Sequence, residues 1–318
     1  MPRSVHFVIA VVFGILAIQP SAAQETANLG LRLSVVGVGA KDYAESMNFY
    51  TKVMSFRPAF SFSPNGKTHN TYFQVSRDTF LELQEANANN PPGLTHIHMH
   101  ADDVDATVAR LRKAGLAPCT ETVKTACMSD ARIAQPTQEK NAVIVDPSGI
   151  RIEPTQSTPG SLTRKAMDSW DNKNSGTRVL VVGIGVKDYP ESENFYGKLL
   201  GFRVAFKFSS PDGKRTTTYY QISRDTFLEM QPLAADGHLI THVHILTEDL
   251  DAMIARLRAA GLESAPRNST TANRVTEAGV TQPSNVKSAN VFDPNGIRLE
   301  LNELMPDSLT KKAMDSWK

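Results

Sequence analysis

Short stretches in which apolar and polar residues alternate account for much of this chain. In THIHMH (95–100), Ile97 and Met99 alternate with polar side chains, and this period of two predicts a strand with one buried face. Apolar residues three or four positions apart predict a helix after the first strand and another after the fifth. The remaining strands of this half are predicted at 31–41, 57–62, 68–76, 79–84 and, around an Asp-Pro-Ser-Gly turn, within 141–154, with a weakly signalled strand near 119–123. The order βαβββ, repeated once, predicts an α+β domain.

The same pattern returns in the second half of the chain. VVGVGAKDYAESMNFY (35–50) recurs as VVGIGVKDYPESENFY (181–196), and TYFQVSRDTFLELQ (71–84) recurs as TYYQISRDTFLEMQ (218–231). We interpret this as the tandem duplication of a whole domain. The predicted units are a domain at 30–157, a helix and linker at 158–177, a second domain at 178–304 and a C-terminal helix at 305–318.

Each copy ends on a closely similar segment, SLTRKAMDSW (161–170) or SLTKKAMDSW (308–317). Ser161 and Ser308 can cap a short helix, because a serine hydroxyl accepts a hydrogen bond from a backbone N–H of the first turn. We expect these helices to pack on each domain and close it. Contact with a second copy of the chain in a homodimer is the alternative role.

The first 23 residues have the features of a secretory signal peptide. A short basic start precedes the apolar run FVIAVVFGILAI (7–18), and small residues follow in PSAAQ. We therefore expect a periplasmic or secreted protein that has no membrane contact once the signal is removed; an uncleaved anchor is the alternative. An oxidising compartment permits a disulfide between Cys119 and Cys127, the only two cysteines, although two free thiols remain the alternative.

Composition removes some classes of function. The net charge is +1 and no basic run is interleaved with aromatic residues, which argues against nucleic acid as a partner. The glycines of VVGVGA do not form a dinucleotide-binding loop, because the position of the third glycine is taken by Asp42, and by Asp188 in the second copy. No serine or cysteine is placed beside a base as a nucleophile would be.

Strand alternation gathers the polar side chains on the face opposite the apolar one. Ile97 and Met99 belong to the apolar face, so the histidines of the same strand belong to the other. On that face the first copy carries Val35, Gly37, Gly39, Glu82, His96, His98, His100, Arg151 and Glu153. The second copy carries Val181, Gly183, Gly185, Glu229, His242, His244, Arg298 and Glu300. The glycines would leave room there for a ligand, and Tyr72, Gln74, Tyr219 and Gln221 are further candidates to line this space.

Together, FLEL on the fourth strand, H…DDVDA…ARLRKAG on the fifth and DPSGIRIE on the eighth resemble the vicinal oxygen chelate superfamily, which includes glyoxalase I, the extradiol dioxygenases and bleomycin-resistance proteins. The resemblance implies that each domain pairs two βαβββ modules into a cupped half-barrel, with metal ligands on the first, fourth, fifth and eighth strands. It places these ligands at Glu82, His96 and Glu153, and at Glu229, His242 and Glu300. The first-strand ligand, usually histidine, aligns with Val35 and Val181, which excludes a standard four-ligand glyoxalase site.

A second histidine on the fifth strand offers a replacement for the missing ligand. Residues two apart on a strand lie roughly 6.6–6.8 Å apart on one face, so the imidazoles of His96 and His98, or of His242 and His244, can reach one ion. With the glutamates, this donor set suits Zn, Mn, Fe or Ni. His100 is Leu246 in the second copy and is a poor candidate for a shared role. The alternative is a metal-free polar cup in which the glutamates pair with Arg151 or lysines.

Three functions are compatible with these patterns. The first is a metal-dependent lyase, isomerase or dioxygenase acting on a small vicinal-oxygen substrate, with Glu82 or Glu153 (Glu229 or Glu300 in the second copy) as the proton shuttle. The second is a metal-free protein that binds and sequesters a small molecule, as bleomycin-resistance proteins do. The third is an interaction scaffold. His-x-His in both copies favours the first function, and valine on the first strand favours the second.

Overall fold

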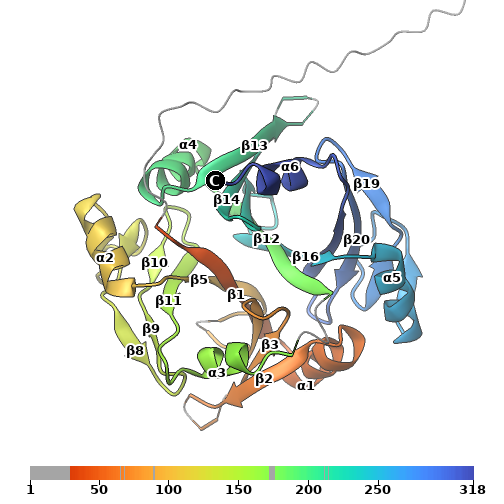
Figure 1. Ribbon diagram of the computed structural model, residues 1–318, viewed down its shortest axis with the longest axis horizontal. Helices are drawn as coiled ribbons and strands as arrows, with labels where there is room; N and C mark the ends of the chain where they lie inside the picture. Colours follow the sequence, from red (N-terminus) through yellow and green to blue (C-terminus); the bar gives the residue numbers. More distant parts are fainter. Residues whose placement is uncertain are drawn as a thin grey trace, which may run out of the picture.

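Two mixed β-sheets, one from each half of the sequence, form the two domains of the computed structural model (Figure 1). The structure describes residues 29–318 except 65, 68, 89, 172–175, 211 and 214, so the predicted signal peptide at 1–23 and most of the predicted linker lie outside the described residues. Each sheet draws all of its strands from its own copy of the repeat. The duplication predicted from the sequence is therefore a duplication of complete α+β domains.

Two βαβββ modules meet at the centre of the N-terminal sheet. Strand β1 (Arg32–Ala40) runs parallel to β4 (Phe80–Glu85) and antiparallel to β5 (Gly93–His100), which in turn runs parallel to β11 (Arg151–Gln156). The remaining strands are β2 (Arg57–Phe62), β3 (Asn70–Gln74), β6 (Ala117–Pro118), β7 (Cys127–Met128), β8 (Arg132–Ala134), β9 (Glu139–Asn141) and β10 (Ile144–Val145). The four strands at the centre are the fourth, first, fifth and eighth strands that the resemblance singled out.

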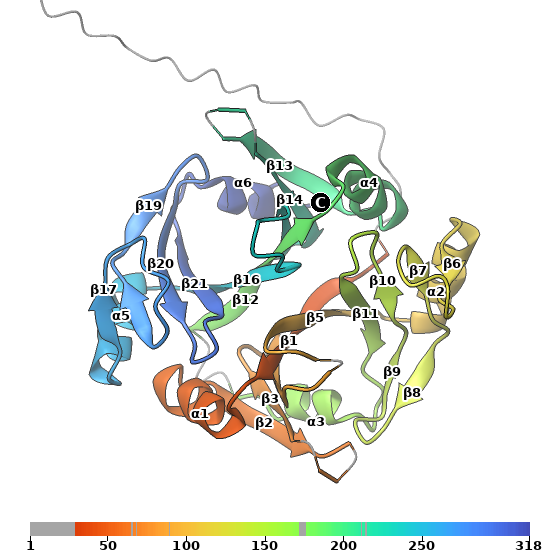
Figure 2. The ribbon, with the colours of Figure 1, turned by 180° about the vertical axis from the view of Figure 1, so that it is seen from behind.

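The C-terminal sheet repeats this order around β12 (Thr177–Val186), β15 (Thr226–Pro232), β16 (Ile240–Thr247) and β21 (Arg298–Leu304). Its outer strands are β13 (Arg203–Ser209), β14 (Thr216–Ser223), β17 (Glu263–Ala265), β18 (Arg274–Thr276), β19 (Gly279–Thr281) and β20 (Val286–Phe292). The two domains lie side by side, and the views from the front and from behind agree on this (Figures 1 and 2).

Aspartate caps begin the helices that follow the first and fifth strands. In the N-terminal domain, Asp42 accepts from the backbone N–H of Glu45 at 2.9 Å and Asp103 accepts from Ala106 at 3.0 Å, as N-cap residues do. These helices are α1 (Tyr43–Asn48) with the π-helical turn η1 (Phe49–Val53), and α2 (Val104–Lys113). Their counterparts are α4 (Tyr189–Glu193), η3 (Asn194–Leu199) and α5 (Leu250–Ala259). No helix among the described residues has the length and apolar character that crossing a membrane requires.

The strand faces follow the predicted alternation. Val36 and Val38, Leu81 and Leu83, Ile97 and Met99, and Ile150 and Ile152 all belong to one buried hydrophobic core. The same core includes the matching residues of the second domain, such as Val182, Ile184, Val243 and Leu299. The apolar faces of both sheets therefore share one core, and the polar faces line the cups.

The irregular region after α2 differs from the prediction. A strand was expected near 119–123, but the chain forms two two-residue strands, β6 and β7, on either side of that position. Cys119 and Cys127 form the expected disulfide there. The short hairpin β8–β9 was not predicted, because three-residue strands are too short to show a period. This hairpin carries residues that reach the cup of the N-terminal domain.

Short helices cover the cups, as the sequence indicated. Helix α3 (Leu162–Asp168) is capped by Ser161 and helix α6 (Leu309–Asp315) by Ser308, each serine accepting a backbone N–H bond of 3.2 Å. Ala166 of α3 packs on the cup face of its own sheet with Val35, Tyr72 and Phe80. Gln74, expected to line the cup, instead donates to the carbonyl of Ala166 at 3.3 Å and holds this helix in place; Gln221 does the same for Ala313.

Candidate metal centres

A glycine on the central strand lets a carboxylate and an imidazole meet in the N-terminal cup. Gly37 of β1 is the register partner of Glu82 on β4 and of His96 on β5. A Cβ atom at Gly37 would lie 2.2 Å from the imidazole of His96, so only glycine leaves space for this ring. Nε2 of His96 lies 3.1 Å from Oε2 of Glu82, with both side chains almost fully buried.

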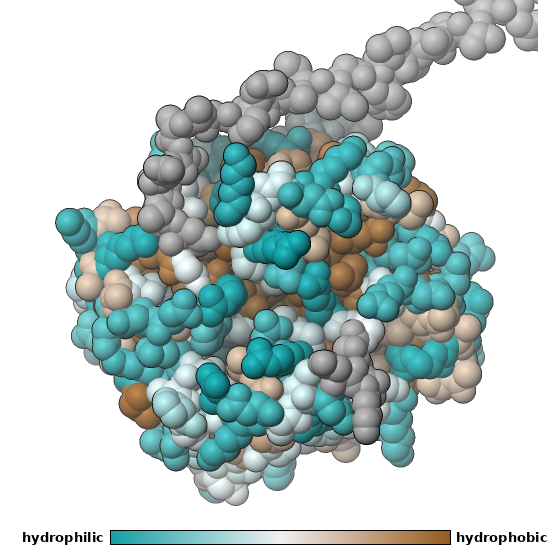
Figure 3. Space-filling model, in the orientation of Figure 1, coloured by the Kyte–Doolittle hydropathy of each residue, from teal (hydrophilic) through white to brown (hydrophobic). Residues whose placement is uncertain are grey.

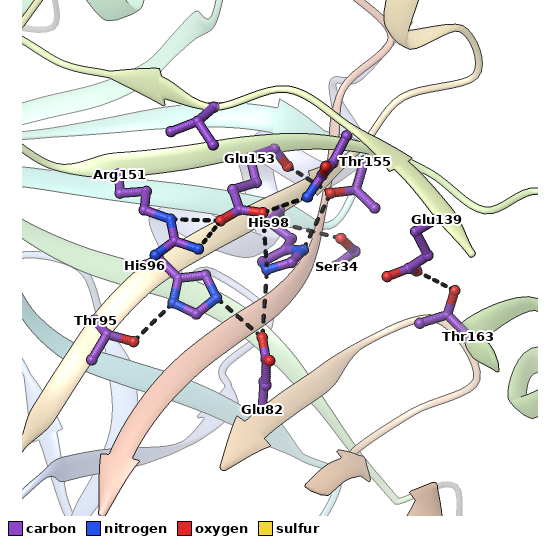
Figure 4. A network of polar contacts seen from close by, with 12 residues as sticks. Ser34, Glu82, Thr95, His96, His98, Glu139, Arg151, Glu153, Thr155 and Thr163 are labelled. Atoms are coloured by element: carbon purple, nitrogen blue, oxygen red, sulfur yellow. Dashed lines mark hydrogen bonds and ion pairs between the residues drawn. The ribbon is translucent and has the colours of Figure 1, made fainter. Parts of the chain in front are cut away.

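The second histidine of the strand points at the same carboxylate oxygen (Figure 4). Nε2 of His98 lies 3.5 Å from Oε2 of Glu82, beyond hydrogen-bond geometry, and this buried nitrogen has no hydrogen-bond partner among the described residues. The other ring nitrogens are held by hydroxyls, Nδ1 of His96 by Thr95 at 2.8 Å and Nδ1 of His98 by Thr155 at 3.2 Å. The ligand atoms of Glu82, His96 and His98 all lie within 4.8 Å of one another.

Glu153, the fourth predicted ligand, lies at the edge of this group. Its Oε2 is 3.7 Å from Nε2 of His98, but the same oxygen accepts a 2.8 Å hydrogen bond from Asn141. Its other oxygen, Oε1, accepts a 2.6 Å hydrogen bond from Nε of Arg151. Glu153 is therefore already satisfied by protein partners, as the metal-free interpretation expected for a glutamate beside Arg151.

The C-terminal cup builds the same triad. Oε2 of Glu229 lies 3.4 Å from Nε2 of His242 and 3.2 Å from Nε2 of His244. Nε2 of His244 is buried and has no hydrogen-bond partner among the described residues, as in the first copy. Tyr219 donates a 2.6 Å hydrogen bond to Oε2 of Glu229. Glu300 is more distant, with Oε1 3.9 Å from Nδ1 of His244.

The first strand supplies no ligand in either domain. Val35 and Val181 pack among apolar side chains under α3 and α6. The position nearest the triad is glycine, at Gly37 and Gly183, where the ring of the first histidine takes the space. His100 lies outside the triad and faces Asp102 at 3.5 Å. In both cups the triad thus combines two histidines of one strand with a glutamate of the strand two places away in the sheet.

Charges inside the cups keep the carboxylates ionised. Burial by itself raises the pKa of Glu82, but the hydrogen bond of His96 and the charges of His96 and His98 outweigh burial and hold the pKa well below its usual range. Glu229 shows the same balance with its own two histidines, which hold its pKa well below the usual range. Burial lowers the pKa of His98, and the charges of Glu153 and Glu82 more than reverse this, so the net pKa is raised. Such a cluster of buried anions favours a bound cation.

A cavity of about 250 Å³ opens onto the C-terminal triad. Its wall includes Phe208, Tyr219 and Arg298 together with the triad and Glu300. In the space-filling view, apolar side chains gather in a hollow near the centre of the face and hydrophilic side chains surround it (Figure 3). The volume accommodates a small molecule but no macromolecule.

The residues present fit a divalent cation. Two buried imidazole nitrogens per domain point at a carboxylate oxygen, one of them with no hydrogen-bond partner, and their opposite ring nitrogens are fixed by Thr95 and Thr155, or by Thr241 and Asn302. Outer partners of this kind orient metal-binding histidines. The donor set of two histidines and one carboxylate is nitrogen- and oxygen-based, as Zn, Mn, Fe or Ni sites are.

Several residues that support the triads were not predicted. Asn70 donates to Oε1 of Glu82 at 3.1 Å and Gln84 donates to the same oxygen at 2.5 Å. Asn141 and Glu139 reach the cup from the unpredicted hairpin. Gln84 stands two residues after Glu82 on the same strand, so strand alternation was the available signal for its place in the cup. Asn141 stood only at the start of the predicted segment 141–154, and no pattern indicated Glu139.

Comparison with known proteins assigns the fold to a family. The family model of the glyoxalase/bleomycin resistance protein/dioxygenase superfamily matches residues 32–153 and again residues 178–301. The chain belongs to this superfamily. Both copies are members, which bears out the resemblance seen in the motifs. No curated protein matches this chain.

Solved structures share the fold at low identity. The Mn(II)-bound glyoxalase from Novosphingobium aromaticivorans is 16% identical, with a TM-score of 0.62 over 87% of this chain and 82% of that chain. A mutant of 4-hydroxymandelate synthase from Streptomyces coelicolor is 12% identical, with a TM-score of 0.65 over 90% and 96%. Homoprotocatechuate 2,3-dioxygenase from Arthrobacter globiformis is 17% identical, with a TM-score of 0.59 over 88% and 82%. At this identity the similarity establishes the tandem fold and leaves the reaction open.

Proposed function

We propose that this member of the superfamily is a divalent-metal-dependent enzyme that acts on a small molecule through two neighbouring oxygen atoms. The observation that carries the proposal is the triad of one glutamate and two histidines in each cup. In both, one buried imidazole nitrogen points at the carboxylate and has no hydrogen-bond partner among the described residues. An unsatisfied buried polar atom costs free energy, so its presence in both copies supports a ligand there.

Each residue of the cup has a distinct task in this proposal. Glu82, His96 and His98, and in the second copy Glu229, His242 and His244, would hold the cation. A divalent cation bound there stabilises negative charge on substrate oxygens as a Lewis acid. The cation is proposed to be Zn, Mn, Fe or Ni. Non-haem iron oxygenases also bind their metal with two histidines and one carboxylate. Iron therefore stays among the candidate metals although the first strand supplies no histidine.

The remaining side chains shape the substrate's surroundings. Arg151 neutralises and orients Glu153, so this carboxylate stays fixed beside His98 and can accept a hydrogen bond from a substrate hydroxyl. Stacked aromatic rings form one wall of each cup, Phe60, Phe62 and Tyr72 in the first and Phe206, Phe208 and Tyr219 in the second. These rings would exclude water from the bound molecule.

We also propose that the mature protein acts in the periplasm or outside the cell, which the signal-like start and the Cys119–Cys127 disulfide support.

A specific observation favours a second function, metal-free binding of a small molecule. Arg151 and Asn141 satisfy Glu153, and Asn302 satisfies Glu300, so one glutamate of each cup needs no cation. A protein of this kind would sequester its ligand in the same cups.

Metal content of the mature, untagged protein distinguishes the two functions. After reconstitution with Zn²⁺, Mn²⁺, Ni²⁺ or Fe²⁺, plasma mass spectrometry should find about two equivalents per chain, one for each triad. His98→Ala and His244→Ala should each remove one equivalent. His100→Ala is the matched control, because it alters a histidine of the same strand outside the triad. No bound metal after reconstitution with any of the four ions would leave the binding function.

A further inference from the structure

The two cups differ at one buried position. Asn141 of β9 pairs with Thr155, and Ser288 of β20 pairs with Asn302 in the same register of the second copy. Two residues before each of these lie Glu139 and Val286. The N-terminal cup thus has a carboxylate where the C-terminal cup has an apolar side chain.

Position 139 faces the cup. Its counterpart Val286 lines the cavity over the C-terminal triad, and so does Thr310 of α6. Thr163, the counterpart of Thr310 on α3, donates a hydrogen bond to Oε1 of Glu139 (Figure 4). Glu139 is therefore held between helix α3 and the sheet. It lies on the wall of the N-terminal cup, with 4% of its surface exposed.

Glu139 is the carboxylate of this cup with the fewest hydrogen-bond partners among the described residues. Among the described residues, Thr163 is its one side-chain hydrogen-bond partner, and it has no ion pair. Glu153, by contrast, accepts hydrogen bonds from Arg151 and Asn141. Glu82 is held by Asn70, Gln84 and His96. Oε2 of Glu139 accepts no hydrogen bond within the same part of the chain. A carboxylate with one open oxygen on the wall of the cup that would hold the cation is placed to exchange a proton with a bound molecule.

Titratable groups on four strands act on Glu139, and α3 contributes the neutral hydroxyl of Thr163. Burial is the largest influence and raises the pKa of Glu139 to about 6; the charges of Glu82 and Glu153 act in the same direction, while Thr163 and His98 act against it. Tyr72 of β3 also interacts with this charge. The pKa of Glu82 and that of Glu153 are both lowered instead, so those two carboxylates stay ionised and are poor proton carriers.

We propose that Glu139 is the general acid–base group of the N-terminal cup, and that the C-terminal cup, which has Val286 there, has no such group and loses the proton of a bound ligand to solvent. This rests on the proposed function. Oε2 of Glu139 takes a proton from a substrate O–H or C–H bond, and the electron pair of that bond stays on the substrate. The resulting carboxylic acid returns the proton to the product, so no further reactant is required. The shuttle role expected for Glu82 or Glu153 passes to Glu139.

The duplication offers a reciprocal exchange as the test. One protein keeps only the N-terminal site (His242→Ala/His244→Ala) and is compared with its Glu139→Val and Glu139→Gln forms. The other keeps only the C-terminal site (His96→Ala/His98→Ala) and is compared with its Val286→Glu form. Single His244→Ala or His98→Ala substitutions replace the double ones if folding by circular dichroism is impaired. Glu139→Val copies the residue that the second domain already accommodates.

Zn²⁺ and catechol are the probes, because zinc is redox-inert and catechol carries two neighbouring acidic oxygens. Calorimetry at neutral pH in two buffers of different ionisation enthalpy gives the protons released per catechol bound. We expect the N-terminal cup to keep the proton and its Glu139→Val and Glu139→Gln forms to release about one more per catechol. The C-terminal cup should release about one proton, and Val286→Glu should reduce this release.

The outcomes separate the two proposals. Absence of bound zinc and of every other reconstituted metal overturns the proposed function itself. Bound zinc with equal proton release in the presence and absence of Glu139 overturns only the role of Glu139. Zinc-loaded protein that binds no catechol in either cup also overturns it, because the N-terminal cup then takes no vicinal hydroxyls from which Glu139 could remove a proton.

Discussion

The hydroxyl of Tyr50 in the N-terminal domain donates a 3.0 Å hydrogen bond to Oδ2 of Asp293 in the C-terminal domain. The duplication repeats this contact in the opposite direction, since Tyr196 donates to Asp146 at 2.9 Å. Both tyrosines are fully buried, and both aspartates belong to the Asp-Pro-Xaa-Gly turn before the last strand of their sheet. The helix of each domain is thereby fixed to the turn that precedes the Arg-x-Glu strand of the other domain's cup.

Loss of either tyrosine hydroxyl should weaken the pairing of the domains. Tyr50→Phe leaves a buried oxygen of Asp293 without its phenolic donor, and hydrogen bonds to charged groups contribute about 1.5–3 kcal/mol, so we expect a loss of that size in the free energy of unfolding. Urea denaturation measures it. Tyr43→Phe is the control, because its hydroxyl contacts Thr71 within one domain and is half-buried. Equal losses in the two variants would contradict a special role for the contact between domains.

Adding one methyl group to the central strand should displace a histidine. A Cβ at Gly37 would lie 2.2 Å from the ring of His96, so Gly37→Ala should move this imidazole away from Glu82 and remove one metal equivalent. Overpacking of this kind costs about 1–3 kcal/mol, which the fold should survive. Metal analysis and a thermal melt together test this. Gly176→Ala, where a Cβ meets nothing within 4 Å, should retain both equivalents.

The two glutamates of a cup should differ in their importance for metal binding. Glu82 faces both histidines, so Glu82→Gln should abolish binding at the N-terminal site. Glu153 is already held by Arg151 and Asn141, so Glu153→Gln should weaken binding only about 10–100-fold, as loss of an outer partner does. Competition with a chromophoric chelator gives both affinities. Equal effects of the two substitutions would make Glu153 a fourth ligand.

Glu139 should lower stability as the pH rises. Its folded pKa of about 6 lies above the unfolded value, so the native state binds more protons than the unfolded state between these pKa values. Ionisation therefore costs the wild type about 2 kcal/mol by neutral pH, and none of this below the unfolded pKa. Relative to wild type, Glu139→Val should gain about that amount in unfolding free energy between pH 4 and pH 7.5 in chelator. If the difference in unfolding free energy between the two proteins stayed constant across this range, the pKa of Glu139 would not be raised by folding.

Opening the disulfide should cost stability without emptying the cups. The chain-entropy cost for so short a loop is roughly 2–3 kcal/mol, so Cys119→Ser/Cys127→Ser should lose that amount. Guanidinium denaturation measures the loss. Metal content should stay at wild-type level, because the loop lies outside both triads. Reduction of the disulfide in the wild type should lower stability by the same amount. Loss of metal on opening the disulfide would contradict its purely stabilising role.

Strand periodicity was sufficient for the central part of each domain. A period of two needs only a few residues, so the faces of the strands that carry Glu82, His96, His98 and Glu153 were correct before any fold was known. The hairpin β8–β9 and the strands β6 and β7 have two or three residues each, too few for a period to show. Glu139 therefore had no signal, and Asn141 stood only at the start of a predicted segment, although both reach the N-terminal cup.

The sequence by itself determined the duplication, the α+β class, the helix caps at Ser161 and Ser308, and the set of residues on each polar face, because these depend on local spacing. Only the tertiary structure decided which of those residues meet. Register across three strands brings Glu82 and His96 together over Gly37, and Arg151 with Asn141 draws Glu153 to one side. Contacts between residues far apart in sequence depend on strand pairing and packing over the whole sheet, which no local pattern records.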